Sequence, residues 1–219
     1  MSSNNVKEDS VAVAGAGKKS KSTFREYAES IVFALLLALF IRSFIVQAFK
    51  IPSGSMIPTL QVGDHILVNK LSYGIRNPFW GSFLAYFKKP QRGDVVVFIF
   101  PEDRTKDFIK RVIGVEGDMV EIREKKIYIN GKPLEDPHAH FEGDAPERGT
   151  FNIRDEYGPR QVPAHHIFVM GDNRDRSYDS RYWGYVDLDD VKGRAFLIYW
   201  SWDGTDRWVR WERIADLIY

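Results

Sequence analysis

The sequence predicts a mainly β domain that follows one N-terminal membrane-spanning helix. Two observations lead to this fold class. A run of 20 residues, Ser30–Phe49, holds a single charge at Arg42, and a helix of that length spans the hydrocarbon core of a bilayer, roughly 30 Å. The rest of the chain has short apolar runs separated by turn residues and no long stretch of helical periodicity, a pattern typical of strands.

Composition excludes several classes of protein. With 44% hydrophobic and 28% charged residues, the 219-residue chain has the balance of a folded domain, which excludes wholesale disorder. It has no cysteine, so disulfide scaffolds, zinc ribbons and cysteine nucleophiles are excluded. The formal net charge is +1, without the basic stripe of a nucleic-acid-binding protein. We expect no nucleic acid among its partners, and no metal or other cofactor, because the sequence shows no ligand cluster.

The N-terminal part predicts a tail and an anchor. Residues 1–26 are poor in side chains that could pack, which favours a disordered tail, and residues 27–48 form the expected transmembrane helix. Four cations lie close before the span: Lys18, Lys19, Lys21 and Arg25. By the positive-inside rule this tail is cytoplasmic, and residues 49–219 form an extracytoplasmic domain.

Two other interpretations of the apolar run stay open. One is a cleaved signal peptide, since Val46-Gln47-Ala48 is a tolerable small-x-small cleavage site. The other is a buried core helix, although such hydrophobicity is rare in one. The long preceding tail and Arg42 inside the run favour the anchor, and near the end of a span an arginine reaches the interface by snorkelling.

The part after the apolar run predicts short strands. Five runs are strand candidates, at residues 92–101, 108–115, 125–132, 166–170 and 195–200. Asn130-Gly131 is the signal of a type I′ hairpin turn. Residues 134–162 are charged and irregular, so we expect a short inserted loop or cap there.

Two serines lie just beyond the apolar run. Residues 49–60 form a proline-flanked segment in which Gly54 allows a tight turn between Ser53 and Ser55. Taken alone, this segment is more simply a polar loop. A nucleophilic serine needs a base, and the sequence has neither a Gly-x-Ser-x-Gly elbow nor a recognisable histidine triad. A Ser–Lys pair is the other option.

Lys110 is the candidate base. It lies among apolar residues, and in a strand its side chain shares a face with Phe108 and Val112. Burial there would lower the pKa of its amine by as much as roughly 3–5 units and would supply a neutral base at working pH. A lysine on an edge strand, facing water, is the alternative.

A third segment, residues 171–184, is dense in hydrogen-bonding side chains. A calcium loop is a poor interpretation because its spacing of aspartates around a glycine is missing. A charged turn is the simple alternative. The high density of oppositely charged residues favours a network of ion pairs that fixes the geometry of a site.

Together, in this order behind an apolar helix, these segments resemble the bacterial type I signal peptidases, or leader peptidases. The resemblance runs from about residue 24 to residue 186, and five blocks carry it: residues 49–60, 63–70, 92–95, 108–114 and 171–181. It implies an antiparallel, coiled-sheet β domain of a membrane-bound endopeptidase. Such enzymes use a Ser–Lys dyad to remove signal peptides from exported preproteins, and they cut after small residues at −1 and −3.

The resemblance also implies roles for the polar residues of the site. Ser55 is the nucleophile and Lys110 is its general base. The Ser53 hydroxyl joins the Ser55 N–H in the oxyanion hole, where each donor is worth roughly 10²–10³ in rate. Ser177 hydrogen-bonds the lysine and orients it.

Further residues are implied in support and in substrate binding. Asp179 and Arg181 form a supporting ion pair, while Arg111 is structural. Three residues line the shallow pockets for the small side chains of the preprotein: Phe49, Ile51 and Ile109.

Partners and location follow from the same resemblance. We expect exported preproteins, the phospholipid bilayer and encounters with the Sec and Tat export machineries, at the bacterial cytoplasmic membrane. The chain departs from some relatives in three ways. It has one span instead of two, no cysteine for a disulfide, and a short stretch between residues 118 and 163 that predicts a reduced cap.

Aromatic residues give a separate expectation about the membrane. Trp80 lies in an apolar, aromatic loop followed by two lysines, which predicts a loop that dips into the lipid headgroups. A position of Trp80 in the core is the alternative. Four further tryptophans near the C-terminus are expected to lie in the core: Trp200, Trp202, Trp208 and Trp211.

Two other functional classes were weighed against the peptidase. A self-cleaving Ser–Lys protein of the repressor type has a related β architecture, but the span between tail and Ser55 and the lack of a DNA-binding module disfavour it. A non-enzymatic, membrane-anchored adaptor predicts no coupling between Ser55 and Lys110. The peptidase predicts that loss of either residue abolishes cleavage.

Overall fold

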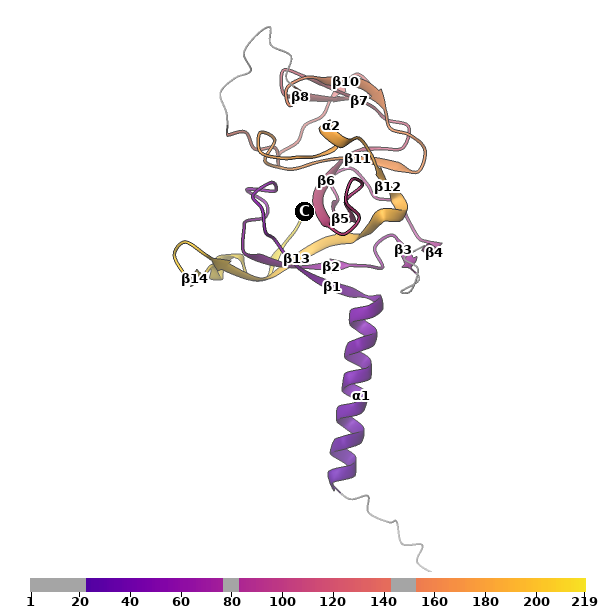
Figure 1. Cartoon of the computed structure of the whole chain (residues 1–219), viewed down its shortest axis with the longest axis vertical. Coiled ribbons are helices and arrows are strands. Elements are labelled where there is room, and N and C mark those ends of the chain that lie inside the picture. The colour runs from indigo at the N-terminus through magenta and orange to yellow at the C-terminus, as the bar shows by residue number, and fades with distance from the viewer. Residues whose placement is uncertain (1–22, 77–82, 143–152) are drawn as a thin grey trace, which may run out of the picture. The chain divides into compact units, whose positions relative to one another are not determined.

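Strands are the main regular secondary structure of the computed structural model, which describes residues 23–76, 83–142 and 153–219 (Figure 1). The helices are α1 (Thr23–Phe44) and α2 (Ser180–Trp183), with short 3₁₀ turns at Leu188–Asp190 and Trp211–Arg213. The strands up to the middle of the chain are β1 (Val46–Lys50), β2 (Asp64–Asn69), β3 (Gly74–Arg76), β4 (Phe83–Tyr86), β5 (Val95–Ile99), β6 (Asp107–Val115), β7 (Met119–Arg123), β8 (Lys126–Ile129) and β9 (Lys132–Pro133). The later strands are β10 (Tyr157–Gln161), β11 (His166–Met170), β12 (Val186–Asp187), β13 (Val191–Asp203), β14 (Trp208–Val209) and β15 (Asp216–Leu217).

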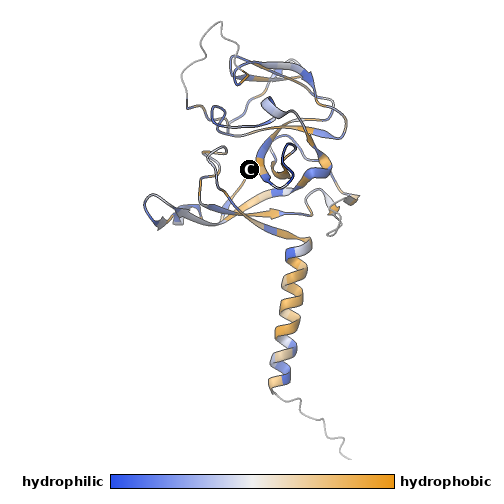
Figure 2. Cartoon of the chain, viewed as in Figure 1, coloured by the Kyte–Doolittle hydropathy of each residue, from blue (hydrophilic) through white to orange (hydrophobic). Residues whose placement is uncertain are grey.

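Helix α1 is apolar along most of its length (Figure 2). Within the described residues it is the one helix long and apolar enough to cross a membrane, over Phe24–Phe44. It starts and ends earlier than the expected span of 27–48. Residues 23–26, expected in the tail, are its first turn, and residues 1–22 of that tail lie outside the described residues.

The end of the expected span is a strand. Residues 46–48 belong to β1, which pairs with β2 in antiparallel register from Val46 opposite Asn69 to Lys50 opposite His65. Hydropathy does not distinguish the end of an apolar helix from an apolar strand that continues it. The pairing with β2, which lies farther along the chain, decides between the two.

One large antiparallel sheet carries the site. Its strand order is β1-β2-β13-β5-β6-β11-β12, and β14 and β15 also pair with β13. Register shifts interrupt β13 after Val191, Ala195 and Ile198, and such irregularities bend a strand and increase its twist. This confirms the mainly β, antiparallel fold class.

A second sheet, β10-β7-β8-β9, has four strands. Asn130 and Gly131 both have positive φ between β8 and β9, which confirms the type I′ hairpin there. Glu124 and Lys125 form an equivalent turn between β7 and β8. The sequence did not indicate that turn, because neither residue type favours the left-handed region.

Part of the expected insertion, residues 134–162, belongs to this second sheet. Its last residues form β10, which pairs with β7. Residues 143–152 lie outside the described residues, as do residues 77–82 with the expected Trp80 loop between β3 and β4.

The core positions the segment that contains the serines. Met56 and Leu60 are fully buried, and they pack with Ile51, Ile66 and Ile198 in one hydrophobic cluster. Two large apolar side chains on either side of a short turn fix that turn against the sheet, because each buried side chain of this size contributes about 1.5–3 kcal/mol. The fold therefore holds residues 55–60 against β2, β5 and β13.

Candidate active site

Ser55 and Lys110 meet in the folded chain, although 55 positions separate them. Ser55 lies on the turn that follows β1, and Lys110 lies on β6 opposite Val96 of β5. Lys110 Nζ is 2.7 Å from Ser55 Oγ, within hydrogen-bond distance. The lysine is only 4% exposed, and its Nζ lies 5.5 Å from the centre of the Phe108 ring. This geometry excludes the alternative in which Lys110 is a water-facing edge residue.

Burial changes the acidity of Lys110. It lowers the pKa of the ammonium from 10.5 to about 8, because the charged form loses its hydration. The charges of Asp179 and Asp172 act in the opposite direction, and the charge of Arg181 adds to the lowering. A large fraction of Lys110 is therefore a neutral amine at mildly basic pH, the form that can accept a proton.

Ser53 lies beside Ser55. Its Oγ is 3.5 Å from Ser55 Oγ. Among the residues described, no acceptor is hydrogen-bonded to the Ser55 N–H. Two donors, one hydroxyl and one backbone N–H, are thus available next to the atom that would attack a carbonyl carbon.

Asp179 and Arg181 form the expected ion pair. Arg181 Nε donates to Asp179 Oδ1 at 2.8 Å and Arg181 Nη2 donates to Oδ2 at 2.9 Å, with both side chains buried. Asp179 also caps the N-terminus of α2 and accepts from the Gly171 N–H at 3.1 Å. One carboxylate therefore fixes both α2 and the end of β11.

Ser177 does not form the expected hydrogen bond with Lys110. Its hydroxyl is buried and has no hydrogen-bond partner among the residues that the structure describes. It packs against Gly171 instead. A Cβ at Gly171 would lie 2.3 Å from Ser177 Oγ and 2.4 Å from the Ser55 carbonyl oxygen. Only glycine fits here, and its role was not predictable from the sequence, because a glycine after a strand has many explanations.

A second buried ion pair joins the same region, and sequence reasoning missed its acid. Arg111 binds Asp172 through two hydrogen bonds, Nε to Oδ1 at 2.8 Å and Nη2 to Oδ2 at 2.7 Å. The N–H of Asn173 donates to the Ser55 carbonyl oxygen at 3.1 Å. The Gly-Asp-Asn sequence directly after an apolar strand was the available signal for both residues.

The three expected pocket residues lie together. Phe49 and Ile109 are partly buried and pack against the same hydrophobic cluster that contains Ile51. Ile51 itself is only 2% exposed. Phe49 and Ile109 can therefore present surface to a ligand, whereas Ile51 lies beneath them in the core.

Comparison with known proteins identifies the family. The signal peptidase family, peptidase S26, matches residues 24–200. A signal peptidase I of Pseudomonas fluorescens is 41% identical over 81% of this chain and 72% of its own length. One of Leptolyngbya laminosa is 37% identical, over 85% of each chain. The chain belongs to the signal peptidase family. A solved signal peptidase I of Enterococcus faecalis is 36% identical, covers 49% of this chain and 97% of its own, and has a TM-score of 0.40.

In this signal peptidase family member the C-terminal tryptophans are not core residues. Their exposed fractions run from 37% for Trp200 to 66% for Trp208. The last residues of β13, Trp202 and Asp203, pair with Val209 and Trp208 of β14 in a short hairpin. Trp200 and Trp202 line an open groove of about 550 Å³ together with Lys50 and His65. The expectation that these tryptophans lie in the core is therefore wrong.

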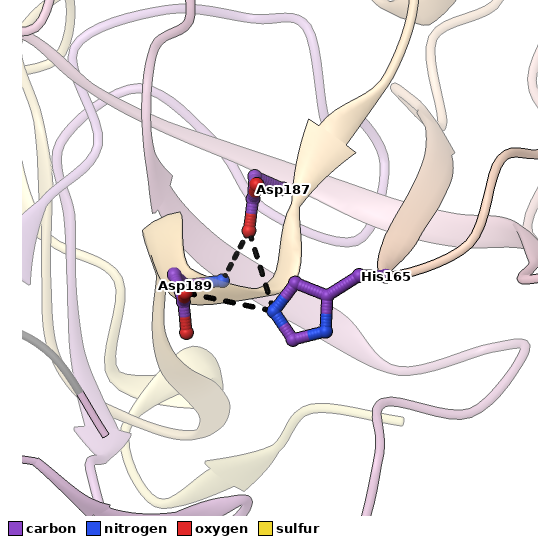
Figure 3. Close-up of side chains that lie close together, drawn as sticks. All are labelled: His165, Asp187 and Asp189. Atoms are coloured by element: carbon purple, nitrogen blue, oxygen red, sulfur yellow. Dashed lines mark hydrogen bonds and ion pairs between the residues drawn. The ribbon is translucent and has the colours of Figure 1, made fainter.

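Three side chains of types that can bind a metal ion lie close together as a group, apart from Ser55 and Lys110 (Figure 3). His165 Nε2 is 3.6 Å from an oxygen of Asp187 and 3.6 Å from one of Asp189, and it is the one such group in the part of the chain that the structure describes. Asp187 also accepts from the Asp189 N–H at 2.8 Å, and the Tyr86 hydroxyl donates to Asp189. Internal hydrogen bonds account for this half-exposed cluster.

Proposed function

We propose that this chain, an endopeptidase that removes signal peptides, cleaves its substrates with Ser55 as the nucleophile and Lys110 as the general base. The observation that carries the proposal is the 2.7 Å approach of Lys110 Nζ to Ser55 Oγ in a buried site. Burial keeps the pKa of Lys110 near 8. A serine hydroxyl at this distance from a neutral amine has the geometry that general-base activation requires.

The reaction proceeds in two stages. The neutral Lys110 amine takes the proton of Ser55 Oγ as this oxygen attacks the carbonyl carbon of the scissile bond. The tetrahedral intermediate collapses when the ammonium returns the proton to the leaving amine, which departs with the mature protein. Lys110 then takes a proton from water, which attacks the carbonyl carbon of the ester that joins Ser55 to the signal peptide. The ester C–O bond breaks as the ammonium returns this proton to Ser55 Oγ, and the signal peptide leaves with a C-terminal carboxyl group.

The developing oxyanion is stabilised by two donors. The Ser53 hydroxyl and the Ser55 N–H lie beside the attacking oxygen, and neither is committed to another strong bond among the described residues. Loss of one such donor costs roughly 10²–10³ in rate. Ser53→Ala should therefore remain measurable, whereas Ser55→Ala should not.

The substrate binds in extended form along free strand edges. β1 is the edge strand of the large sheet. β11 pairs with β6 from Arg111 to Val115. Within the described residues, the earlier part of β6, Asp107–Lys110, is therefore paired with β5 on one side and has a free edge on the other. An extended peptide adds to such edges through main-chain hydrogen bonds. Phe49 and Ile109 then face its side chains at −1 and −3, and the shallow surface over Ile51 admits only small ones.

The bilayer is the second partner in the proposal. Apart from α1, exposed aromatic and apolar side chains gather on the short hairpins β13–β14 and β3–β4 and just beyond them. They include Trp208 and Leu84 on the hairpins and Trp211 and Phe87 directly after them. Figure 1 places these hairpins at the two ends of the β1–β2 layer, on the side away from the four-stranded sheet. Aromatic side chains of this kind favour the headgroup region. The domain lies outside the cytoplasm, where preproteins emerge from the Sec and Tat machineries.

Docking is tested by quenching of tryptophan fluorescence with brominated lipids. Wild-type protein in vesicles should be quenched, and Trp208→Phe combined with Trp211→Phe should lose much of that quenching. Trp183→Phe is the matched control, because Trp183 packs against the core. Trp80→Phe tests the aromatic loop separately. Equal quenching in all variants would exclude the docking surface.

The dyad is tested by cleavage of a synthetic preprotein with Ala at −3 and −1, in detergent. Ser55→Ala and Lys110→Met should each lower kcat by roughly 10⁴ or more, and the double variant should be little worse than either single one. Lys126→Met, on the exposed face of β8, is the control and should cleave normally. Normal cleavage by Lys110→Met would remove Lys110 from the mechanism.

A further inference from the structure

The hydroxyl of Thr59 joins the serine segment to a buried acid. Thr59 lies four residues after Ser55, and its Oγ1 donates to Asp172 Oδ2 at 2.6 Å. Its carbonyl oxygen accepts from Arg213 Nη2 at 2.9 Å, and Arg213 is itself paired with buried Asp64. This single residue is therefore held through both its side chain and its backbone.

The acid at the other end of that bond is fixed. Asp172 is fully buried, and both of its oxygens accept from Arg111, the residue next to Lys110 on β6. Arg111 is fixed in turn, because its Nη1 donates to the Gly93 carbonyl oxygen at 2.8 Å. The strand of the base and Asp172 form one rigid support, to which the Thr59 hydroxyl ties the serine segment.

We propose that Thr59 is a positioning residue for the reaction, whose bond to Asp172 fixes the distance between residues 55–60 and β6. The proposal rests on the pairing of Ser55 with Lys110 described above. Two hydrogen bonds link residues 55–60 to residues 172 and 173. One runs from the Thr59 hydroxyl to Asp172, and the other from the Asn173 N–H to the Ser55 carbonyl oxygen. Without the first, the second alone links the segment to residues 172 and 173, and the alignment of Ser55 Oγ changes.

Stability alone does not explain the bond. If Thr59 is replaced by valine, Asp172 keeps both hydrogen bonds from Arg111, so the buried charge remains paired. We expect a modest loss of melting temperature, since one hydrogen bond to a charged group is lost while the charge itself stays paired. The larger effect falls on the rate, because a misplacement of about 1 Å in a reacting group costs as much as roughly 100-fold.

The test compares Thr59→Val with Thr59→Ser and with Tyr73→Phe in the full chain. Tyr73→Phe is the matched control: it also removes a hydroxyl that donates to a carboxylate, that of Asp94 at 3.0 Å, in a buried site without hydrogen bonds to the dyad. For each variant, kcat and KM on the synthetic preprotein, the pH profile and the melting temperature are measured.

We expect Thr59→Val to lower kcat by roughly 10- to 100-fold with KM changed by less than about twofold. The pH of half-maximal activity should stay in place, because Asp172 keeps its charge and Lys110 its burial. Thr59→Ser should restore kcat to within about threefold of wild type. Tyr73→Phe should lose melting temperature but keep kcat.

Three outcomes would overturn the proposal. The first is a normal kcat in Thr59→Val, and the second is a kcat that falls equally in Tyr73→Phe for the same loss of melting temperature. The third is failure of both Thr59→Val and Thr59→Ala to fold, which would make Thr59 a residue of the fold only. Ser55→Ala, measured alongside, keeps the two proposals apart: full activity there would remove the dyad itself.

Discussion

Lys110 occupies a position that is useful for catalysis and unfavourable for folding. The side chain of a lysine is rarely buried without a bound anion, and here its Nζ contacts the neutral Ser55 hydroxyl. The acids that moderate its pKa, Asp179 and Asp172, are each already bound to an arginine. Arg181 thus opposes the effect of these acids on Lys110, and burial remains the largest influence on the pKa of its ammonium.

The pH dependence of cleavage follows from the acidity of Lys110. Because the pKa of its ammonium lies near 8 and the reactive form is the neutral amine, kcat/KM should rise by about tenfold per pH unit below pH 8. It should level off above that value. Initial rates from pH 6 to pH 10 measure this limb, and a profile that is flat across pH 8 would contradict the role of Lys110 as base.

Stability should respond to Lys110 with a defined sign. The folded-state pKa lies below the unfolded value of 10.5, so the unfolded chain binds the proton more tightly. Wild-type stability is therefore lowered by about 3 kcal/mol below pH 8, and it recovers as the pH rises from 8 to 10.5. Lys110→Met should melt at a higher temperature than wild type at pH 6.5, with a smaller difference at pH 10.5. A lower melting temperature of Lys110→Met than of wild type at pH 6.5 would show that burial of the charged amine is not the main effect of Lys110 on stability.

Gly171 should tolerate no side chain. In Gly171→Ala the new Cβ would meet Ser177 Oγ and the Ser55 carbonyl oxygen at less than 2.5 Å, so the serine turn must shift. We expect a loss of kcat of at least roughly 100-fold. Gly204→Ala is the control, since a Cβ there meets no atom within 4 Å and should leave cleavage unchanged. Equal activity of the two variants would show that the turn adapts freely.

At the scale of elements, structure with a local sequence signal was predictable, whereas structure that depends on pairing between distant segments was not. The strands at β5, β6 and β11 and the Asn130-Gly131 turn were predictable because their signals are local. The end of α1 was displaced because β1 exists only through its pairing with β2. The Glu124–Lys125 turn had no composition signal. The tryptophans of β13–β14 were misassigned because hydrophobicity does not reveal whether a second layer covers a hairpin.

The same distinction applies to the site. Ser55, Lys110, Asp179 and Arg181 were predicted as a set only because five blocks together resemble one family. The hydrogen bond expected from Ser177 is not formed, since a residue's type does not fix the direction of its side chain. Asp172 was not singled out, because its importance depends on Arg111, which lies 61 positions away.

Asp179, which caps α2, affects both the stability of the fold and the pKa of Lys110. Asp179→Asn removes the negative charge that raises the pKa of Lys110, so the limb of the pH profile should move to lower pH. It also leaves the buried Arg181 without a counter-charge, which should lower stability by about 3–5 kcal/mol. The pH profile and the melting temperature measure both effects. Asp216→Asn, at an exposed position of β15, should change neither. A shift of the limb to higher pH would contradict the electrostatic account.

At the scale of the whole molecule, the apolar helix and the catalytic domain have separable tasks. All three hydrophobic clusters lie between Phe49 and Ile218, so we expect the domain to fold without α1. A chain that lacks residues 1–44 should hydrolyse a soluble peptide with kcat/KM within about twofold of the full chain. On a preprotein held in vesicles it should be at least roughly tenfold slower, because an anchored pair has a higher effective concentration. Equal loss on both substrates would instead assign α1 a role in the fold.

The short join between helix and domain has a consequence for which proteins are cut. Phe44 ends α1 and Ser55 follows eleven residues later, a length of chain that reaches at most about 40 Å even when fully extended. A preference for two small side chains is met by chance in many sequences. The tether restricts that weak preference to a thin layer along the membrane, and a matching stretch in a released, distant protein escapes cleavage. With the cleavage preference proposed above, location thus supplies the discrimination that two small side chains alone do not.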